Sequence, residues 1–353
     1  MTYHWFDGHL DLAYLAQQGR DLTATLERCG GGLTPAAVTF PELRKGNVRA
    51  AFATIFVQRR VDEAEAKQKG VEPLTGPWTY TTPDEAFAAS AAQLGIYQHW
   101  NRSNLVELVS ANNRWGGSDR LKIVLLMEGA AGLRHVTDLQ RFYDDGVRIV
   151  ALTWLEGNQW SGGDNSGGDV TPQGRELIAE IDRLNCIHDV SHLSEAAFWT
   201  LMSTAKGIKI ASHSNARALL PGKQFPERNL SDNQLRALAQ SPHAVVGINL
   251  LSAFLASGPN APKRATIQHV LNHIKHIEDV TGRRDLLALG SDFDGGYPRT
   301  SWCENLDGPT QLHLLADALA DAGWSNADIH RFAWQNWADL LAAIGITVAS
   351  PLE

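Results

Sequence analysis

The chain has few cysteines, and this scarcity excludes two classes of protein. Only three occur among the 353 residues, Cys29, Cys186 and Cys303, and no two of them form a Cys-x-x-Cys pair. A disulfide framework or a thiolate zinc site needs cysteines that are more numerous or closer together. Both are therefore excluded, and the low count is typical of a protein from a reducing compartment.

The sequence also lacks a basic cluster and a membrane-length apolar run. Its 31 Lys+Arg face 39 Asp+Glu, a formal net charge of −8, and phosphate binding depends on clustered positive charge. No apolar run approaches the ~18 residues that cross a bilayer. The first basic residue is Arg20, so the positive region of a signal peptide is missing. We expect a cytoplasmic protein with neither nucleic acid nor membrane as its partner.

What the chain does contain is a regular alternation of short apolar runs and helical patterns. Continuous Val/Ile/Leu/Ala runs indicate parallel strands whose faces are covered by helices. The eight predicted strands are 3–10, 49–57, 122–127, 147–153, 187–191, 208–212, 244–250 and 286–290. The predicted helices are 84–112, 135–145, 173–186, 194–206, 231–241, 265–281, 310–322 and 326–344.

Eight strand–helix units predict an α/β fold of the TIM-like (β/α)8 barrel type. We expect one domain over residues 1–353, with the last helices, 326–344, packed on the barrel. A doubly wound open sheet is the alternative. No GxGxxG or GxxxxGK[ST] follows a predicted strand, so a nucleotide-binding version of that sheet would lack its phosphate loop. Two polar stretches, 58–83 and 155–172, follow strands and would lie on the face where barrels bind substrates.

Histidines and carboxylates stand at the ends of these predicted strands. In a barrel the carboxyl ends of the strands meet at one rim, and buried polar groups there need hydrogen bonds, ion pairs or a metal. His9 and Asp11 lie two positions apart, which places both side chains on one face of a strand. Three imidazoles and three carboxylates suit a cation such as zinc, whereas a buried hydrogen-bond network is the alternative. The six are His9, Asp11, Glu128, His192, His213 and Asp292.

In this order the motifs resemble those of the membrane (renal) dipeptidases and their bacterial relatives, metallopeptidases of the amidohydrolase superfamily. They extend from residue 7 to residue 336, nearly the whole chain. The matching elements are Asp7-Gly8-His9-Leu10-Asp11, Glu128-Gly129, Ser191-His192, Ser212-His213-Ser214, Arg228-Asn229, Gly290-Ser291-Asp292-Phe293-Asp294-Gly295 and Asn336.

The resemblance implies two Zn²⁺ ions per chain on a barrel of the metal-dependent hydrolase type. His9 and Asp11 would hold one ion, and His192 and His213 the other. Glu128 would bridge the two ions, in the place that a carboxylated lysine takes in other members of the superfamily.

The same resemblance implies a zinc dipeptidase that attacks the peptide bond with a metal-bridging hydroxide. Asp292 would accept the proton and return it to the leaving amine. Arg228 would bind the terminal carboxylate of the substrate, because a guanidinium matches carboxylate geometry. The implied substrates are small dipeptides, those with a C-terminal D-residue included, and a homodimer is an expectation at the level of the family.

The sequence departs from the family's pattern around the substrate. Where the family has Leu-Thr-His after the fourth strand, this chain has Leu-Thr-Trp, and the indole of Trp154 offers one N–H donor but no proton transfer. The element Asn249-Leu250-Leu251, after the seventh strand, stands where the renal type has an aromatic residue that contacts substrate. We expect Trp154, Asn158, Leu251 and Arg228 to contact substrate. The alternatives are another amide hydrolase on the same metals, such as an N-acyl amino acid deacylase or a cyclic amide hydrolase, and a catalytically impaired metal-binding homologue.

Overall fold

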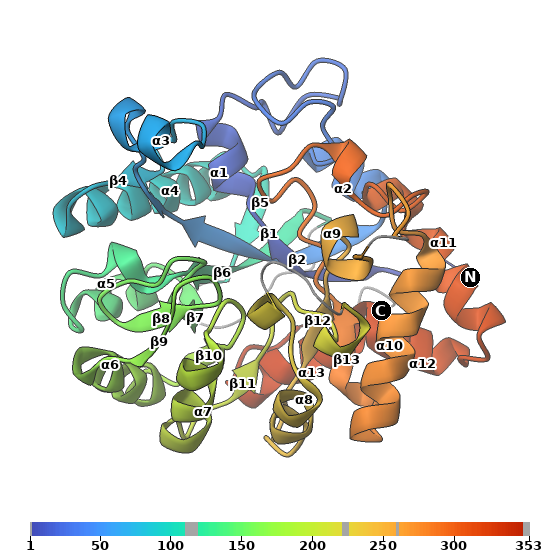
Figure 1. Ribbon diagram of the computed structural model, residues 1–353. Coiled ribbons are helices and arrows are strands. Elements are labelled where there is room, and N and C mark those ends of the chain that lie inside the picture. The colour runs from blue at the N-terminus through green and yellow to red at the C-terminus, as the bar shows by residue number, and fades with distance from the viewer. Residues whose placement is uncertain (1, 110–118, 221–225, 259–260, 349–353) are drawn as a thin grey trace.

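Eight parallel strands form the centre of the molecule in a computed structural model that describes residues 2–109, 119–220, 226–258 and 261–348 (Figure 1). Each lies within or close to one of the eight apolar runs, so all eight predicted strands are confirmed. They are β1 (Trp5–Leu10), β2 (Val48–Phe56), β6 (Leu121–Glu128), β7 (Val147–Ala151), β10 (Ile187–Asp189), β11 (Lys209–Ile210), β12 (Val246–Ile248) and β13 (Leu287–Leu289).

The strands close into a ring. Six of them pair in the order β1-β2-β6-β7-β10-β11, and β12 pairs with β13. A parallel bridge between Ala211 and Val246 joins the two groups. At the other junction, the backbone N–H of Asp292 donates to the carbonyl oxygen of His9 at 3.3 Å. The molecule is therefore the predicted (β/α) barrel and not an open sheet.

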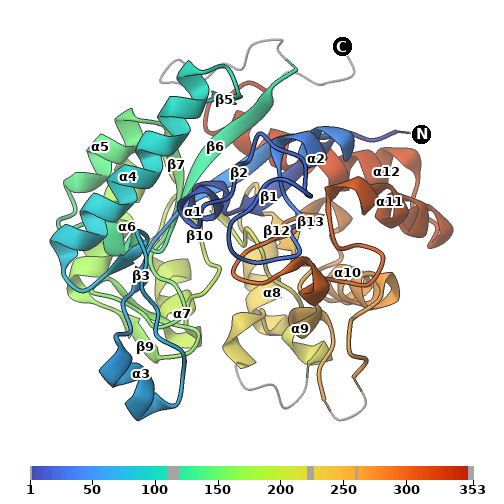
Figure 2. The same ribbon diagram turned by 90° about the horizontal axis from the view of Figure 1, so that it is seen from above.

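Helices surround this ring (Figures 1 and 2). Helix α4 lies against β2, α5 against β7, and α10 against β12. None of the helices in the described ranges combines the length and the hydropathy that a bilayer crossing requires. The helices are α1 (Leu12–Gln17), α2 (Phe40–Lys45), α3 (Glu63–Lys69), α4 (Pro83–Arg102), α5 (Asp138–Asp144), α6 (Pro172–Arg183), α7 (Glu195–Thr204), α8 (Asp232–Ala239), α9 (Ser252–Leu255), α10 (Ile267–Thr281), α11 (Leu312–Asp321), α12 (Asn326–His330) and α13 (Asn336–Ala343).

One predicted helix, 84–112, is wrong over residues 103–109. Helix α4 ends at Arg102, and Asn104 follows with a φ of 57°, a left-handed conformation that asparagine tolerates. The Oδ1 of Asn101 then accepts from the N–H of Leu108 at 3.1 Å. The chain continues as strand β5 (Val106–Leu108), which pairs with β6. The last part of the prediction, 110–112, lies outside the described residues.

The C-terminal helices pack against the strands of the barrel. Helix α12 continues through a π-helical turn (Arg331–Gln335) into α13. The indole Nε1 of Trp337 donates to the carbonyl oxygen of Leu289 at 2.8 Å, and Nδ2 of Asn336 donates to that of Leu287 at 2.8 Å. The side chains of Trp334 and Trp337 join Phe6 and other inner strand residues in one buried cluster. The C-terminal segment is thus part of the barrel's core.

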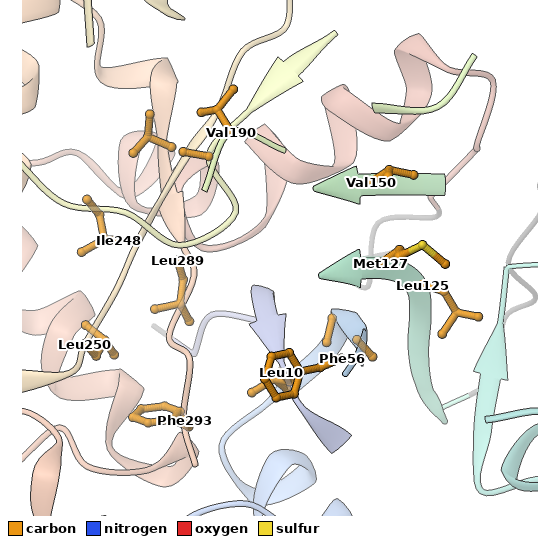
Figure 3. Close-up of a cluster of buried hydrophobic side chains, with 14 of the residues drawn as sticks. Leu10, Phe56, Leu125, Met127, Val150, Val190, Ile248, Leu250, Leu289 and Phe293 are labelled. Carbon is orange, nitrogen blue, oxygen red and sulfur yellow. The ribbon is translucent and has the colours of Figure 1, made fainter. Parts of the chain in front are cut away.

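A second, larger cluster fills the space between strands and surrounding helices. Figure 3 shows part of it, with side chains from several strands and from the segments that follow them. Strand burial on both faces explains why these strands read as continuous apolar runs in the sequence. The labelled members are Leu10, Phe56, Leu125, Met127, Val150, Val190, Ile248, Leu250, Leu289 and Phe293.

The two polar stretches form small ordered elements after β2 and β7. The first contains α3 between strands β3 (Gln58–Arg59) and β4 (Thr79–Tyr80), which pair in parallel. The second forms an antiparallel hairpin of β8 (Ser161–Gly163) and β9 (Gly167–Val170). The hairpin docks on the segment after β10, because Gly163 and Leu193 form a β-bridge.

Candidate metal centre

The six residues predicted from the strand ends lie together at the carboxyl ends of the strands. Their ligand atoms form three overlapping groups, each with atoms within 4.8 Å of one another: His9–Asp11–Glu128, Glu128–His192–His213 and His9–His213–Asp292. The first two groups coincide with the two ligand sets that the family resemblance implies. All six side chains are buried.

Glu128 lies between the two groups of histidines. Its Oε2 is 3.4 Å from Nε2 of His9, whereas its Oε1 is 3.3 Å from Nε2 of His192 and 3.6 Å from Nε2 of His213. Asp11 faces His9, with Oδ1 3.8 Å from the same Nε2. Each oxygen of Glu128 is therefore directed to a different set of nitrogen atoms, as a bridging carboxylate requires.

Two buried aspartates hold the strand ends that carry these residues. Asp7 accepts from the N–H of His9 at 3.2 Å and from that of Ser291 at 2.8 Å, which ties β1 to the end of β13. Asp189 accepts from the N–H of Ser191 and from that of Ser212, both at 3.0 Å, which ties β10 to β11. Asp7 stands in the first sequence motif and Asp189 in the predicted strand 187–191, but pattern alone gave neither of them a role.

The backbone is unusual at two of the site residues. His192 has a φ of 66° and Asp292 a φ of 62°, both in the left-handed region that non-glycine residues seldom adopt. Such conformations persist where surrounding contacts hold them, and they are concentrated at functional sites. Here each one directs a site side chain away from the path of its strand.

The hydrogen bonds around the histidines leave their Nε2 atoms as acceptors. Ser212 donates its hydroxyl to Oδ2 of Asp189 at 2.5 Å, so its oxygen accepts from Nδ1–H of His213 at 2.8 Å. Nδ1 of His192 lies 3.0 Å from a carboxylate oxygen of Asp164 and donates to it. A neutral imidazole with a protonated Nδ1 has a bare lone pair on Nε2. The two Nε2 atoms face each other at 3.1 Å.

Lone pairs that converge in this way fit a bound cation. Two unprotonated nitrogens at this separation cannot hydrogen-bond to each other. Nε2 of His9 is also buried and has no hydrogen bond of good geometry among the described residues. Converging imidazole and carboxylate donors of this kind are the ligands that zinc and similar divalent ions prefer.

The charged groups in the site also favour a bound cation. Burial and, after it, the nearby Glu128 carboxylate raise the pKa of Asp11 to about 7. Burial likewise raises the pKa of Asp292 to about 6. Burial alone would lower the pKa of His9, but Glu128, Asp11 and Asp292 together raise it to about 10. Carboxylates crowded in this way lack positive charge, which a divalent cation would supply.

Asp292 is fixed by a neighbour that the sequence analysis did not single out. Nδ2 of Asn249, at the end of β12, donates to Oδ2 of Asp292 at 2.9 Å. The other oxygen, Oδ1, faces the histidines and lies 4.0 Å from Nε2 of His9. One oxygen of Asp292 is thus occupied and the other is directed into the site.

Arg228 lies beside the site and is not a surface residue, because only 3% of it is exposed. Its Nη1 donates to the carbonyl oxygen of His213 at 2.9 Å and lies 3.3 Å from Oγ of Ser214. Its Nε and Nη2 are buried without a hydrogen-bond partner among the described residues. A buried guanidinium with two unused donors is suited to an anionic ligand.

Trp154 lies with its ring next to that of His192. It is half-buried, with its ring 5.8 Å from that of His192 and 5.0 Å from that of Phe56, measured between centroids. Leu251 is buried and forms the start of α9, where its N–H donates to Oδ1 of Asn249 at 2.7 Å. Trp154 therefore borders the cluster directly, whereas Leu251 supports the neighbouring loop.

The side-chain donors of the loop after Trp154 already have acceptors, some in or next to the loop and some in the segment after β6. Nδ2 of Asn158 donates to the carbonyl oxygen of Leu152 at 2.9 Å, so this amide holds the turn. The neighbouring donors of Gln159, Trp160 and Asn165 donate to Leu133, Ala130 and Glu156, respectively. Contact between Asn158 and substrate stays a prediction, and in this structure its donor is already used.

A (β/α) barrel with imidazoles and carboxylates gathered at the carboxyl ends of its strands defines the class: a metal-dependent hydrolase of the amidohydrolase type. The chain matches the family model described as membrane dipeptidase (peptidase family M19) over residues 2–346. It therefore belongs to the membrane dipeptidase family, as the motifs indicated, and is a hydrolase of that family.

Relatives and solved structures agree with this assignment. The "uncharacterized protein in pqqA 5′ region" of Klebsiella pneumoniae is 34% identical over 230 residues, 63% of this chain and 81% of its own length. Dipeptidase tcpJ of Claviceps purpurea is 30% identical over 63% of this chain, and the match spans only 51% of that longer protein. A metallopeptidase from Rhodobacter sphaeroides, solved with a phosphinate mimic of the dipeptide L-Ala-D-Ala, shares the fold with a TM-score of 0.78 at 24% identity, over 97% of this chain and 99% of its own.

Proposed function

We propose that this chain is a zinc-dependent dipeptidase that hydrolyses the peptide bond of small dipeptides, those with a C-terminal D-residue included. The observation that carries the proposal is the convergence of three Nε2 atoms, on His9, His192 and His213, around the carboxylate of Glu128. Membership of the membrane dipeptidase family supports the same reaction. The family match and the donor set point to one activity from independent directions.

The residues present fit two metal ions. We assign His9 and Asp11 to one ion, His192 and His213 to the other, and Glu128 to both. Bound there, two divalent ions would acidify a water molecule and polarise the substrate carbonyl. Zinc is the ion we propose, because imidazole and carboxylate ligands suit its borderline character.

The remaining residues handle the substrate and the proton. Arg228 would bind the terminal carboxylate with the two donors that the structure leaves unused. As the water oxygen bonds to the carbonyl carbon, Oδ1 of Asp292 takes the proton that the water releases. The C–N bond then breaks, and Asp292 delivers this proton to the leaving amine nitrogen. The products are two free amino acids.

A panel of substrates tests the proposal. Zinc-loaded protein would be assayed on matched L-X-L-Y and L-X-D-Y dipeptides, on N-acyl amino acids and on cyclic amides, with chelator-stripped protein as the control. We expect turnover of dipeptides that disappears on stripping and returns with zinc. Turnover of only the acyl amino acids or cyclic amides would instead establish another amide hydrolase on the same site.

One observation favours a weaker enzyme as the second candidate. Trp154 stands in place of the family's histidine. The amide groups of Asn158 and Gln159, in the loop after it, already donate to backbone carbonyl oxygens. A protein that binds two metals but turns over none of the panel would be the impaired homologue. The single domain over residues 1–353, the homodimer and the cytoplasmic location stay predictions.

A further inference from the structure

Asp164, in the hairpin between β8 and β9, touches the site from outside the predicted ligand set. Its side chain is 4% exposed. Its Oδ2 accepts from Nδ1 of His192 at 3.0 Å, and its backbone N–H donates to the carbonyl oxygen of the same histidine at 2.9 Å. The same Oδ2 lies 3.8 Å from Nε of Arg228. One carboxylate thus contacts both a proposed metal ligand and the proposed substrate anchor.

We propose that Asp164 is a positioning residue that orients His192 and Arg228 together, and so couples the second metal position to the binding of the substrate carboxylate. The proposal rests on the function proposed above. Asp164 itself is remote from the reacting atoms in this scheme and acts only through its two neighbours.

The contact with His192 fixes which nitrogen faces the site. A carboxylate that accepts from Nδ1–H holds the imidazole in the tautomer whose Nε2 carries a lone pair, and it makes that nitrogen a stronger donor. The backbone bond from the Asp164 N–H restrains the same residue, whose φ of 66° needs support from its surroundings. Loss of such a partner typically weakens metal affinity by about 10–100-fold.

The contact with Arg228 places a carboxylate within ion-pair distance of a buried guanidinium. Nη1 of Arg228 is already held by His213 and Ser214, and the Asp164 carboxylate lies on the Nε side. At 3.8 Å this ion pair restrains the guanidinium without using an N–H group, so Nε and Nη2, which have no hydrogen-bond partner among the described residues, are both left for a ligand. Because the arginine is charged at all working pH values, removal of its carboxylate partner would leave it uncompensated in a buried position.

The hairpin is attached firmly enough to position a side chain. The N–H of Ser194 donates to the carbonyl oxygen of Gly162 at 3.3 Å, and its hydroxyl donates to that of Gly168. The two accepting residues, Gly162 and Gly168, lie on opposite sides of Asp164 in the sequence. The hairpin is therefore hydrogen-bonded to the segment that carries His192.

The test compares Asp164→Ala and Asp164→Asn with the matched control Asp169→Asn, which removes an exposed carboxylate from the same hairpin. Titration of zinc against a competing chelator would measure the affinity of each equivalent. In Asp164→Ala we expect one equivalent to bind about 10–100-fold more weakly and the other to be unchanged. KM for a dipeptide should rise more than kcat falls, and Asp164→Asn, which keeps an acceptor, should recover part of the metal affinity. The control should behave like wild type.

Two further outcomes are separable. If the Asp164 variants bind both equivalents with wild-type affinity and have the wild-type KM, the proposal on Asp164 is wrong while the metal site stands. If wild-type protein itself takes up no metal, the proposed function fails first. Should the variants not fold, ¹⁵N-histidine NMR of metal-free wild-type protein decides: Nδ1 of His192 should carry the proton, and a proton on Nε2 with a bare Nδ1 would overturn the proposal.

Discussion

Asn249 donates a hydrogen bond from Nδ2 to Oδ2 of Asp292, with 2.9 Å between the two atoms. Both side chains are buried, and Oδ1 of Asp292 is directed to the histidines. The amide of Asn249 therefore decides which oxygen of Asp292 is free for proton transfer. This bond joins the segments that follow the neighbouring strands β12 and β13, which pair in parallel from Val246–Leu287 to Ile248–Leu289.

The Asp292→Asn substitution should preserve the metals and abolish most of the activity. The new amide has nearly the same shape, and its oxygen can still accept from Asn249, so the site keeps its geometry. An amide cannot accept a proton at neutral pH, so kcat should fall by about 10²-fold or more. Metal analysis and steady-state kinetics on one preparation would check both parts. A near-normal kcat would show that another group carries the proton.

Metal content should follow the two ligand sets. Wild-type protein should bind two equivalents of divalent metal per chain. Asp11→Ala should weaken the equivalent shared with His9, whereas Glu128→Ala should weaken both, because its two oxygens face different histidines. Elemental analysis after zinc loading and desalting would measure this. Only trace metal in the wild-type protein after zinc addition would refute the binuclear assignment.

Substitutions at Trp154 should show which of two roles it has. Either it replaces a hydrogen-bond donor to the transition state, or its ring packs against the substrate side chain. A lost donor to the transition state typically costs about 3 kcal/mol, roughly a hundredfold in kcat. If Trp154 takes the place of such a donor, Trp154→His should raise kcat on small dipeptides such as Ala-Ala or broaden the range of substrates. We expect this, together with an apolar-leaning preference in the wild-type enzyme. Loss of activity in Trp154→His with activity kept in Trp154→Phe would instead identify a wall that packs against substrate.

The three cysteines should be unreactive in the folded protein. All are free and buried, and burial raises the pKa of the Cys186 and Cys303 thiols to about 12. Thiolate is the reactive form, so a chromogenic disulfide reagent at pH 8 should label the native protein very slowly. Labelling in denaturant should reach three thiols per chain. Rapid labelling of native protein would contradict the burial of these residues.

The Arg20→Met substitution should destabilise the fold without removing a site residue. Arg20 pairs with Asp294 in the interior, and Asp294 also accepts from the N–H groups of Ala37 and Val38, both at 2.8 Å. Removal of one partner leaves a buried charge uncompensated, which typically costs about 3–5 kcal/mol. Urea unfolding would measure the loss. Arg175→Met, at a solvent-exposed position on α6, serves as the control and should change little.

The amino-acid sequence was sufficient for the barrel and for the six residues at its centre. Each buried strand corresponds to a continuous apolar run in the sequence. Each His, Asp or Glu of the site stands at or near the end of such a run. Because parallel strands in a barrel end at one rim, order along the chain translates into proximity in space. His9 and Asp11 needed only the two-residue period of a strand.

Other features depended on contacts between distant segments. The end of α4 at Arg102 was decided by a left-handed Asn104 and by the pairing of β5 with β6, which helical periodicity does not reveal. The role of Asp164 arose only when the hairpin docked beside His192, 28 positions along the chain. The use of the Asn158 donor within its own turn was equally hidden. A sequence pattern indicates which face of a helix or strand is buried. The hydrogen-bond partner of each polar group depends on how distant segments pack, and this packing is present only in the folded chain.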